Sequence, residues 1–153
     1  MEELERYITD NQESFYRLAY SYVKDRDAAL DVVQNAVLKA LTHWGSLREP
    51  AYLKTWFYRI LVNEGLSYLR KNRRLIPTDV FWDEQAPEED IPGRIDVYEA
   101  VERLNPKLRT VVVLRFFEDM PLQEIAAVTG LNLSTVKTRL YHALKLLKKE
   151  IGQ

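Results

Sequence analysis

The sequence predicts an all-α protein, built from two small helical domains that an acidic linker joins. Apolar residues recur with the i, i+3, i+4, i+7 spacing of amphipathic helices at both ends of the chain, and no segment of comparable length alternates as a strand does. Glycine is scarce, at 5 of 153 residues, and strong helix formers dominate the composition. Between the two periodic parts, residues 76–93 contain prolines and carboxylates that break the pattern. We therefore expect domains at residues 1–75 and 94–153, separated by a linker at 76–93.

The N-terminal domain is expected to be a helical bundle with three striped helices. The stripe of the first helix consists of Phe15, Leu18, Ala19 and Tyr22. Asp25 to Asp27 then interrupt the pattern and offer an N-cap. The second helix is predicted to carry its apolar side at Leu30, Val33, Val37, Ala40 and Leu41. After a loop at 45–50, the third helix is striped by Leu53, Trp56, Phe57 and Ile60. Trp at stripe spacing usually packs in a core, so we expect this third stripe to be buried.

The C-terminal domain is expected to contain four short helices. The first is striped by Ile95, Tyr98, Val101 and Leu104. Asn105 and Pro106 are expected to cap and start the second helix, because both residue types favour those positions. The apolar side of that helix is predicted to be Leu108, Val111, Val112 and Phe116. The third helix is expected to start at Pro121, and its buried side is predicted to consist of Leu122, Ile125 and Ala126. The fourth is striped by Val136, Leu140, Ala143, Leu144 and Leu147.

Residues 121–147 have the organisation of a helix-turn-helix. A short helix leads into a turn in which Gly130 suits a positive φ and Asn132 can cap the longer helix. Such a unit places its second helix in the major groove of DNA. The side chains expected to face outward are Ser134, Thr135, Lys137, Thr138, Tyr141 and His142, with Arg139 and Lys145 in reach of phosphates. The alternative is an ordinary helical hairpin whose polar face is solvated.

Charge and composition exclude several other classes of protein. The net charge of −1 is unevenly distributed, at about +2 over residues 1–75, −7 over 76–105 and +4 over 106–153. Cysteine is absent and there are two histidines, so we expect no disulfide, no metal site and no cofactor. The lack of a Gly-rich phosphate loop or nucleophile motif argues against an enzyme with a small-molecule substrate. No apolar run approaches the roughly 18 residues of a membrane span, and the N-terminus is acidic, so we expect a soluble cytoplasmic protein.

Five short motifs occur together in a recognisable order. The C-terminal motifs are Phe116–Asp119, Leu122–Ala126 and Ser134–Leu140. The N-terminal motifs are Asp31–Asn35 and Thr55–Ile60, with Asn63 beyond. In order and spacing the chain resembles the extracytoplasmic-function (ECF) sigma factors, the smallest members of the bacterial sigma-70 family, over most of its length outside the linker. The resemblance implies a sigma factor that binds core RNA polymerase, recognises the −10 and −35 promoter elements and promotes DNA melting to initiate transcription.

The resemblance implies contacts with the bacterial polymerase core. In this family the N-terminal domain binds the clamp helices of the largest subunit, and the C-terminal domain sits on the flap of the second-largest subunit. The polymerase-binding surface would include Asp31, Gln34 and Asn35. Without the resemblance, these three residues would be interpreted as a solvated helix face opposite Val33 and Val37.

Two sets of DNA-binding residues are also implied by the resemblance. For the −10 element, the loop from Trp44 to Pro50 would capture an unstacked base. The pocket and the nearby phosphate contacts would comprise Leu47, Arg48, Lys54, Thr55, Asn63, Arg70, Lys71, Arg73 and Arg74. Leu47 stands where related chains often carry an aromatic, so weaker stacking is expected. The helix dipole explains part of the basic cluster at 70–74 without DNA.

For the −35 element, the resemblance implies that four side chains of the last helix face the bases, namely Lys137, Thr138, Tyr141 and His142. His142 stands where arginine is frequent, and a neutral imidazole offers one donor in place of a bidentate fork. The alternative for His142 is a surface histidine without a partner.

Members of the family are commonly held inactive by an anti-sigma factor, often membrane-bound, and their linker threads toward the RNA exit channel. An acidic linker suits that channel by mimicking the charge of RNA, although a merely solubilising linker explains the charge nearly as well. The competing hypothesis for the whole chain is a stand-alone helix-turn-helix regulator, which would bind duplex DNA as a dimer with half-sites one helical turn apart.

Overall fold

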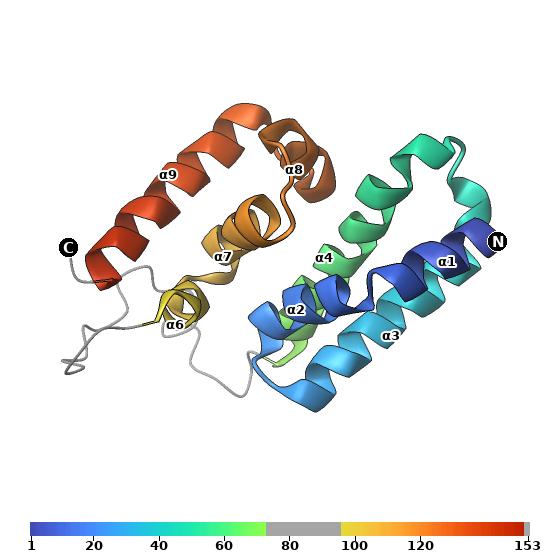
Figure 1. Cartoon of the computed structure of the whole chain (residues 1–153), viewed down its shortest axis with the longest axis horizontal. Coiled ribbons are helices and arrows are strands. Elements are labelled where there is room, and N and C mark those ends of the chain that lie inside the picture. The colour runs from blue at the N-terminus through green and yellow to red at the C-terminus, as the bar shows by residue number, and fades with distance from the viewer. Residues whose placement is uncertain (73–95, 152–153) are drawn as a thin grey trace.

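The computed structural model describes residues 1–72 and 96–151, and every regular element in those ranges is helical. The first group of helices is α1 (Glu2–Asp10), α2 (Gln12–Val23), α3 (Arg26–Thr42) and α4 (Leu53–Asn72), with short 3₁₀ turns at Trp44–Ser46 and Pro50–Tyr52. The second group is α6 (Val97–Arg103), α7 (Pro106–Val112), α8 (Leu122–Thr129) and α9 (Leu133–Glu150), with η4 (Val113–Phe117) after α7. Figure 1 shows the two groups side by side. The all-α prediction is confirmed. The predicted linker at 76–93, Arg73, Arg74 and Ile95 lie outside the described residues.

Helix α1 was not predicted from the sequence. It is short and rich in glutamate, and Leu4 is its one fully buried side chain. Tyr7 also contacts the core, with its ring 5.7 Å from that of Phe15 and 6.2 Å from that of Phe57, centre to centre. Few residues of α1 are apolar, so its sequence shows little amphipathic periodicity. Its contacts with the bundle hold it in place.

The bundle core is built by α2 and α4 around aromatic rings in close contact. Phe15 lies 4.4 Å from Phe57 and 5.4 Å from Tyr58, ring centre to ring centre. Phe57 is fully buried as predicted, and Trp56 and Ile60 are half-buried and packed against the core. These side chains fix the position of α4, whose other faces carry the candidate −10 residues.

The predicted apolar side of α3 is only partly confirmed: Ala40 is fully buried, but its two leucines are not. Leu30 and Leu41 are exposed, at 42% and 36%, and Val33 and Val37 are only partly buried. Beside Ala40, the buried side consists of Ala28, Ala29, Val32 and Ala36, which were not predicted. Small side chains allow the backbone of α3 to approach α2 and α4 closely, so alanine supplies the contact and the larger leucines are left outside. The predicted start is confirmed, since Asp25 Oδ2 accepts a hydrogen bond from the Ala28 amide at 2.9 Å.

In the second group, three of the predicted apolar stripes each contain a residue that is exposed in the structure. Phe116 is 52% exposed, and Phe117 is the residue that packs against the core. The chain forms a π-helical turn at Val113–Phe117, and the extra residue in that turn rotates the following side chains. Tyr98 is exposed as well, but its ring stacks on Phe117 at 5.4 Å. Leu144 of α9 is also exposed rather than buried.

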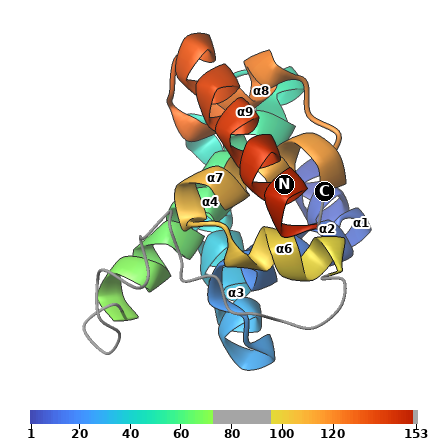
Figure 2. The same cartoon turned by 90° about the vertical axis from the view of Figure 1, so that its left-hand side faces the viewer.

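The local signals for helix starts and for the turn in the second group are confirmed. Asn105 caps α7 by accepting from the Leu108 amide at 3.0 Å, and Pro106 is the first residue of that helix. Gly130 ends α8 with φ of +77°, and Asn132 caps α9 by accepting from the Thr135 amide at 2.8 Å. Figure 2 shows α8 and α9 crossing at an angle above α7.

The two groups of helices pack against each other. Helix α8 lies against α4, and α7 with η4 lies against α2. The buried apolar residues of both groups join in one connected cluster. This packing places the helix-turn-helix over the start of α4.

Candidate polymerase and DNA interfaces

The second helix of the helix-turn-helix, α9, has one buried and one open side. Its buried side consists of Val136, Leu140, Ala143 and Leu147, which pack mainly on α7. The candidate −35 residues that are exposed are Ser134, Lys137, Thr138 and Tyr141, and those that are half-buried are Thr135, Arg139 and His142. None of the predicted −35 residues therefore belongs to the buried side of α9.

Among these residues, Tyr141 is the most prominent. It is 71% exposed, more than any other large apolar side chain in the described ranges. The Thr138 hydroxyl donates to the Ser134 carbonyl at 3.0 Å, so its oxygen keeps lone pairs for a donor from outside. His142 is half-buried and engaged with another group, so the alternative of a surface histidine without a partner is wrong.

On α3, the candidate polymerase-binding residues share a surface that the fold leaves open. Asp31, Gln34 and Asn35 are all exposed. Leu38, one turn further along, is 61% exposed and was not singled out in the sequence. The spacing of residues 31, 34, 35 and 38 follows one helix face. An exposed leucine beside three polar groups is a signal for a contact surface that the pattern of apolar residues alone did not reveal.

Around the start of α4, the candidate −10 residues are only partly brought together. Arg48 and Asn63 are exposed, Thr55 is half-buried, and Lys54 is exposed but paired with Glu124 of α8. Leu47 is half-buried against the core, beside the Trp44–Trp56 ring pair. Arg70 and Lys71 are exposed in the last turn of α4.

Two residues of this region were missed from the sequence. Arg59 is exposed and lies one turn after Thr55 and one turn before Asn63, on the same face of α4. Tyr52 is 63% exposed in the 3₁₀ turn that precedes α4. The i, i+4 spacing of residues 55, 59 and 63 could have identified Arg59 as a candidate for the −10 surface. No local pattern distinguishes Tyr52 from a core tyrosine.

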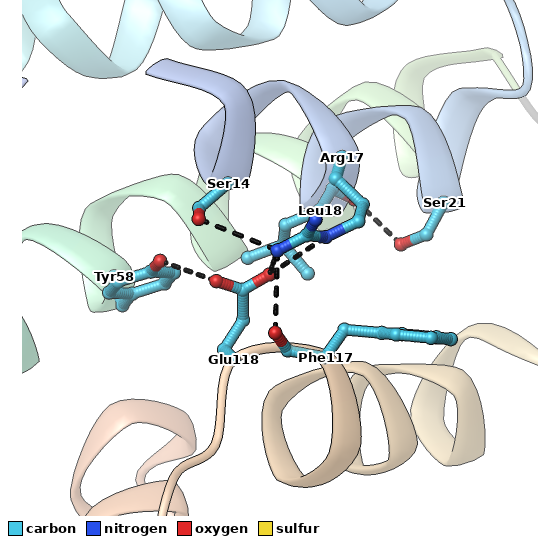
Figure 3. A network of polar contacts seen from close by, with 7 residues as sticks. All are labelled: Ser14, Arg17, Leu18, Ser21, Tyr58, Phe117 and Glu118. Atoms are coloured by element: carbon cyan, nitrogen blue, oxygen red, sulfur yellow. Dashed lines mark hydrogen bonds and ion pairs between the residues drawn. The ribbon is translucent and has the colours of Figure 1, made fainter. Parts of the chain in front are cut away.

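Between the two groups of helices lies a polar network around the buried carboxylate of Glu118 (Figure 3). The Glu118 carboxylate, 3% exposed, accepts hydrogen bonds from Arg17 at 3.1 Å and from the Tyr58 hydroxyl at 2.9 Å. Burial and the neighbouring Glu118 carboxylate raise the pKa of Tyr58 well above its usual range, so the hydroxyl keeps its proton. Neither partner of Glu118 was predicted from the sequence, because they lie 101 and 60 residues away.

The described residues give no sign of a metal site or a membrane span. Within residues 1–72 and 96–151, no three acidic or histidine side chains lie close enough to hold a metal ion. Over the same ranges, no helix combines the length and apolar character needed to cross a bilayer.

These features define a two-part helical protein with a helix-turn-helix and a polar contact surface on α3. Residues 7–75 match the family described as "Sigma-70 region 2", and residues 94–147 match "Sigma-70, region 4". The chain therefore belongs to the sigma-70 family, and it is an RNA polymerase sigma factor of the ECF type.

Individual relatives agree with this assignment. RNA polymerase sigma factor SigV of Bacillus subtilis is 45% identical over 149 residues, which cover 94% of this chain and 88% of SigV. The sigma factor RpoE of Bartonella quintana, solved in complex with the anti-sigma factor NepR, superposes with a TM-score of 0.77 at 25% identity. That superposition covers 97% of this chain and 96% of RpoE. CnrH, solved with the cytosolic domain of CnrY, shares the fold with a TM-score of 0.70 at 21% identity, over 95% of this chain and 85% of CnrH.

Proposed function

We propose that this sigma factor binds core polymerase through α3, reads the −10 element at the start of α4 and reads the −35 element with α9. The observation that supports this proposal best is the presence of both sigma-70 regions in one chain that also exposes polar faces on α3 and α9. The proposed division is residues 1–75 for polymerase and −10 contacts, 76–93 as a linker, and 94–153 for the −35 element. The linker lies outside the described residues, so entry into the RNA exit channel stays a prediction.

For polymerase binding, the proposed surface is Asp31, Gln34 and Asn35. These side chains are exposed, and the adjacent Leu38 gives the surface an apolar component. Interfaces between proteins combine such apolar anchors with a polar rim. A variant with alanine at residues 31, 34 and 35 is expected to lose affinity for core polymerase at least tenfold. Glu13→Ala, an exposed carboxylate on α2, is the matched control and is expected to bind normally.

For the −10 element, the proposed ligands are Leu47, Arg48, Lys54, Thr55, Asn63, Arg70, Lys71, Arg73 and Arg74. Arg59 belongs with them, since it lies between Thr55 and Asn63 on one helix face. Leu47 packs against the core, so it is suited to support the loop more than to stack on a base. The exposed ring of Tyr52 is better placed to offer a stacking surface.

For the −35 element, the proposed reading residues are Ser134, Thr135, Lys137, Thr138, Arg139, Tyr141 and His142. Tyr141 can contact a thymine methyl with its ring and a phosphate or base edge with its hydroxyl. Lys137 and Arg139 supply positive charge for the backbone. The positive end of the α9 dipole adds to that attraction at the first turn.

As a sigma factor this chain would be a non-catalytic subunit that works in the cytoplasm, where the polymerase acts, and it would use no cofactor. An anti-sigma factor is a further expected partner, because RpoE of Bartonella quintana was solved with one and superposes on almost the whole chain. A membrane-bound form of that partner stays a prediction.

Reconstitution with core polymerase on a promoter library tests the proposal. We expect promoter-dependent transcripts with core enzyme and only weak duplex binding without it, since a chain of net charge −1 has little counterion release to exploit. Tyr141→Ala should lower transcription from −35-dependent promoters about tenfold, which corresponds to one lost base contact. Lys148→Ala, exposed at the far end of α9, is the control. Absence of any promoter-dependent transcript would refute the proposed function.

A further inference from the structure

The exposed side of α9 has a row of residues that lies opposite its buried side. The direction of the core is given by the four buried residues of this helix, Val136, Leu140, Ala143 and Leu147. Residues 134, 138, 141 and 145 follow the i, i+4, i+7, i+11 spacing of one helix face and point away from that core. All four are exposed, and we name them the central stripe: Ser134, Thr138, Tyr141 and Lys145.

The middle of the central stripe lacks the side chains that form paired hydrogen bonds with bases. Arginine and lysine form such contacts with guanine, and asparagine or glutamine with adenine. Helix α9, which the structure describes throughout, contains no asparagine or glutamine, and its single arginine, Arg139, is half-buried beside the stripe. Asn132 precedes the helix and uses Oδ1 to cap the Thr135 amide. Thr138 and Tyr141 therefore have to distinguish bases by another kind of contact.

Thr138 offers DNA a methyl group and no hydrogen-bond donor. Its hydroxyl donates to the Ser134 carbonyl at 3.0 Å, so the proton is used within the helix. The oxygen keeps lone pairs that can accept from an amino group of a base. The other contact group of Thr138 is its methyl, and a threonine methyl is suited to an apolar contact with the C5-methyl of thymine.

Tyr141 adds an aromatic ring three residues further along α9. It is 71% exposed, and the next apolar side chain on this side, Leu144, is 37% exposed. In the major groove, the C5-methyl of thymine is the apolar group that such a ring can cover. Residues three apart in a helix are separated by a rise of about 4.5 Å, which is close to the spacing of about 3.4 Å between successive base pairs. Thr138 and Tyr141 are thus spaced to face neighbouring base pairs.

Lysines lie on both sides of these two residues. Lys137 immediately precedes Thr138, and Lys145 lies one turn after Tyr141, both exposed. Their ammonium groups attract phosphates, and either lysine can also donate to guanine. Phosphate contacts hold a helix in the groove without distinguishing one base from another. The discrimination between thymine and cytosine is therefore left to the side chains in the middle of the stripe.

We propose that Thr138 and Tyr141 recognise the C5-methyl groups of thymines in two neighbouring A·T pairs of the −35 element. The inference rests on the proposed function, because it concerns the helix already proposed to read that element. It adds the chemical group that is recognised and assigns one methyl contact to each of the two side chains.

Promoter templates that lack single methyl groups test the inference. Core polymerase with this sigma factor first selects −35 elements from a randomised library. Each thymine of a selected element is then replaced by deoxyuridine, which removes the C5-methyl and keeps the base pair. At holoenzyme concentrations below saturation, we expect uracil at two neighbouring pairs to lower transcription about fourfold each, the effect of removing one methyl from an apolar contact. Uracil in the spacer is the control and should have no effect.

Matched substitutions assign each methyl to one side chain. Tyr141→Phe keeps the ring and should keep both uracil effects, whereas Tyr141→Ala should abolish the effect at one pair only. Thr138→Val keeps a methyl group and should keep the effect at the other pair, whereas Thr138→Ser keeps the hydroxyl and should lose it. Both side chains are exposed, so these changes leave the buried side of α9 intact. Lys148→Ala, outside the central stripe, should retain both uracil effects.

The outcomes separate this inference from the proposed function. Uracil effects that only the matching variants remove support methyl recognition. Selected elements without neighbouring A·T pairs, templates on which uracil changes nothing, or uracil effects that persist in Tyr141→Ala and Thr138→Ser overturn it, while promoter-dependent transcription still supports the proposed function. If no template gives a promoter-dependent transcript, the proposed function is refuted and the inference is refuted with it.

Discussion

Replacing Gly65 by alanine tests how closely α4 packs against α2. A Cβ at residue 65 would lie 2.3 Å from Cδ2 and 2.8 Å from Cε2 of Tyr22, whereas ordinary contact begins at 3.4 Å. The Tyr22 ring must therefore move by about 1 Å, although it is buried and hydrogen-bonded to Thr110. The substitution thus perturbs the bundle and the domain interface together.

The magnitude follows from three contributions to the free energy of unfolding. Overpacking a filled core costs about 3 kcal/mol at the upper end of its range, which suits so short a contact. Loss of the Tyr22–Thr110 hydrogen bond adds about 1 kcal/mol, and the better helix propensity of alanine returns about 1 kcal/mol. We expect a net destabilisation of about 3 kcal/mol, or a fall in Tm of roughly 6–12 °C for a chain of this size.

Urea and thermal unfolding followed by circular dichroism measure this effect. Gly45→Ala is the matched control, because nothing lies within 4 Å of its added Cβ and its φ is not positive. That variant should unfold within about 0.5 kcal/mol of the unchanged chain. If Gly65→Ala were as stable as the unchanged chain, the close approach of α2 and α4 would be incorrect.

Three further predictions concern the cap of α9, the buried tyrosines and the contact of α8 with α4. Asn132→Ala removes the cap of α9 and should lower the free energy of unfolding by about 1 kcal/mol, measured in urea; no change would mean that the cap bond contributes nothing. Burial raises the pKa of three tyrosines above the usual value near 10, so their stabilising contribution is complete below pH 10 and declines as the pH rises further. In absorbance at 295 nm, we expect these three of the nine tyrosines to ionise only as the chain unfolds, namely Tyr7, Tyr22 and Tyr58. Glu124→Gln frees Lys54 from a partly exposed ion pair, so it should strengthen DNA binding by the free chain up to about fivefold, measured by fluorescence anisotropy. Glu64→Gln, which affects an ion pair within the first group, is the control and should leave DNA binding unchanged.

The sequence predicted the features that depend on residues close together in the chain. The caps by Asp25, Asn105 and Asn132 and the positive φ of Gly130 all form as expected, because a cap or a left-handed turn is decided within three or four residues. Most stripes on the helices were also right, since a helix with one apolar side has a single way to bury it.

The errors arose where packing partners decide the orientation of a helix. On α3 the leucines dominate the hydrophobic pattern, yet Ala36 and Ala40 face the bundle because close helix packing favours small side chains there. The π-helical turn at 113–117 exchanged the roles of Phe116 and Phe117, and no local motif signals that extra residue. Both effects originate in neighbouring helices that are distant in sequence.

The packing between the two groups of helices also explains why charge composition alone describes this chain poorly. Lys54 appears free in the sequence, but in the structure it pairs with Glu124 of α8. A phosphate contact at Lys54 would have to displace Glu124 before it released counterions, so the free chain gains less from DNA than its basic segments indicate. The ion pair between α4 and α8 therefore lowers the positive charge that the start of α4 offers to DNA.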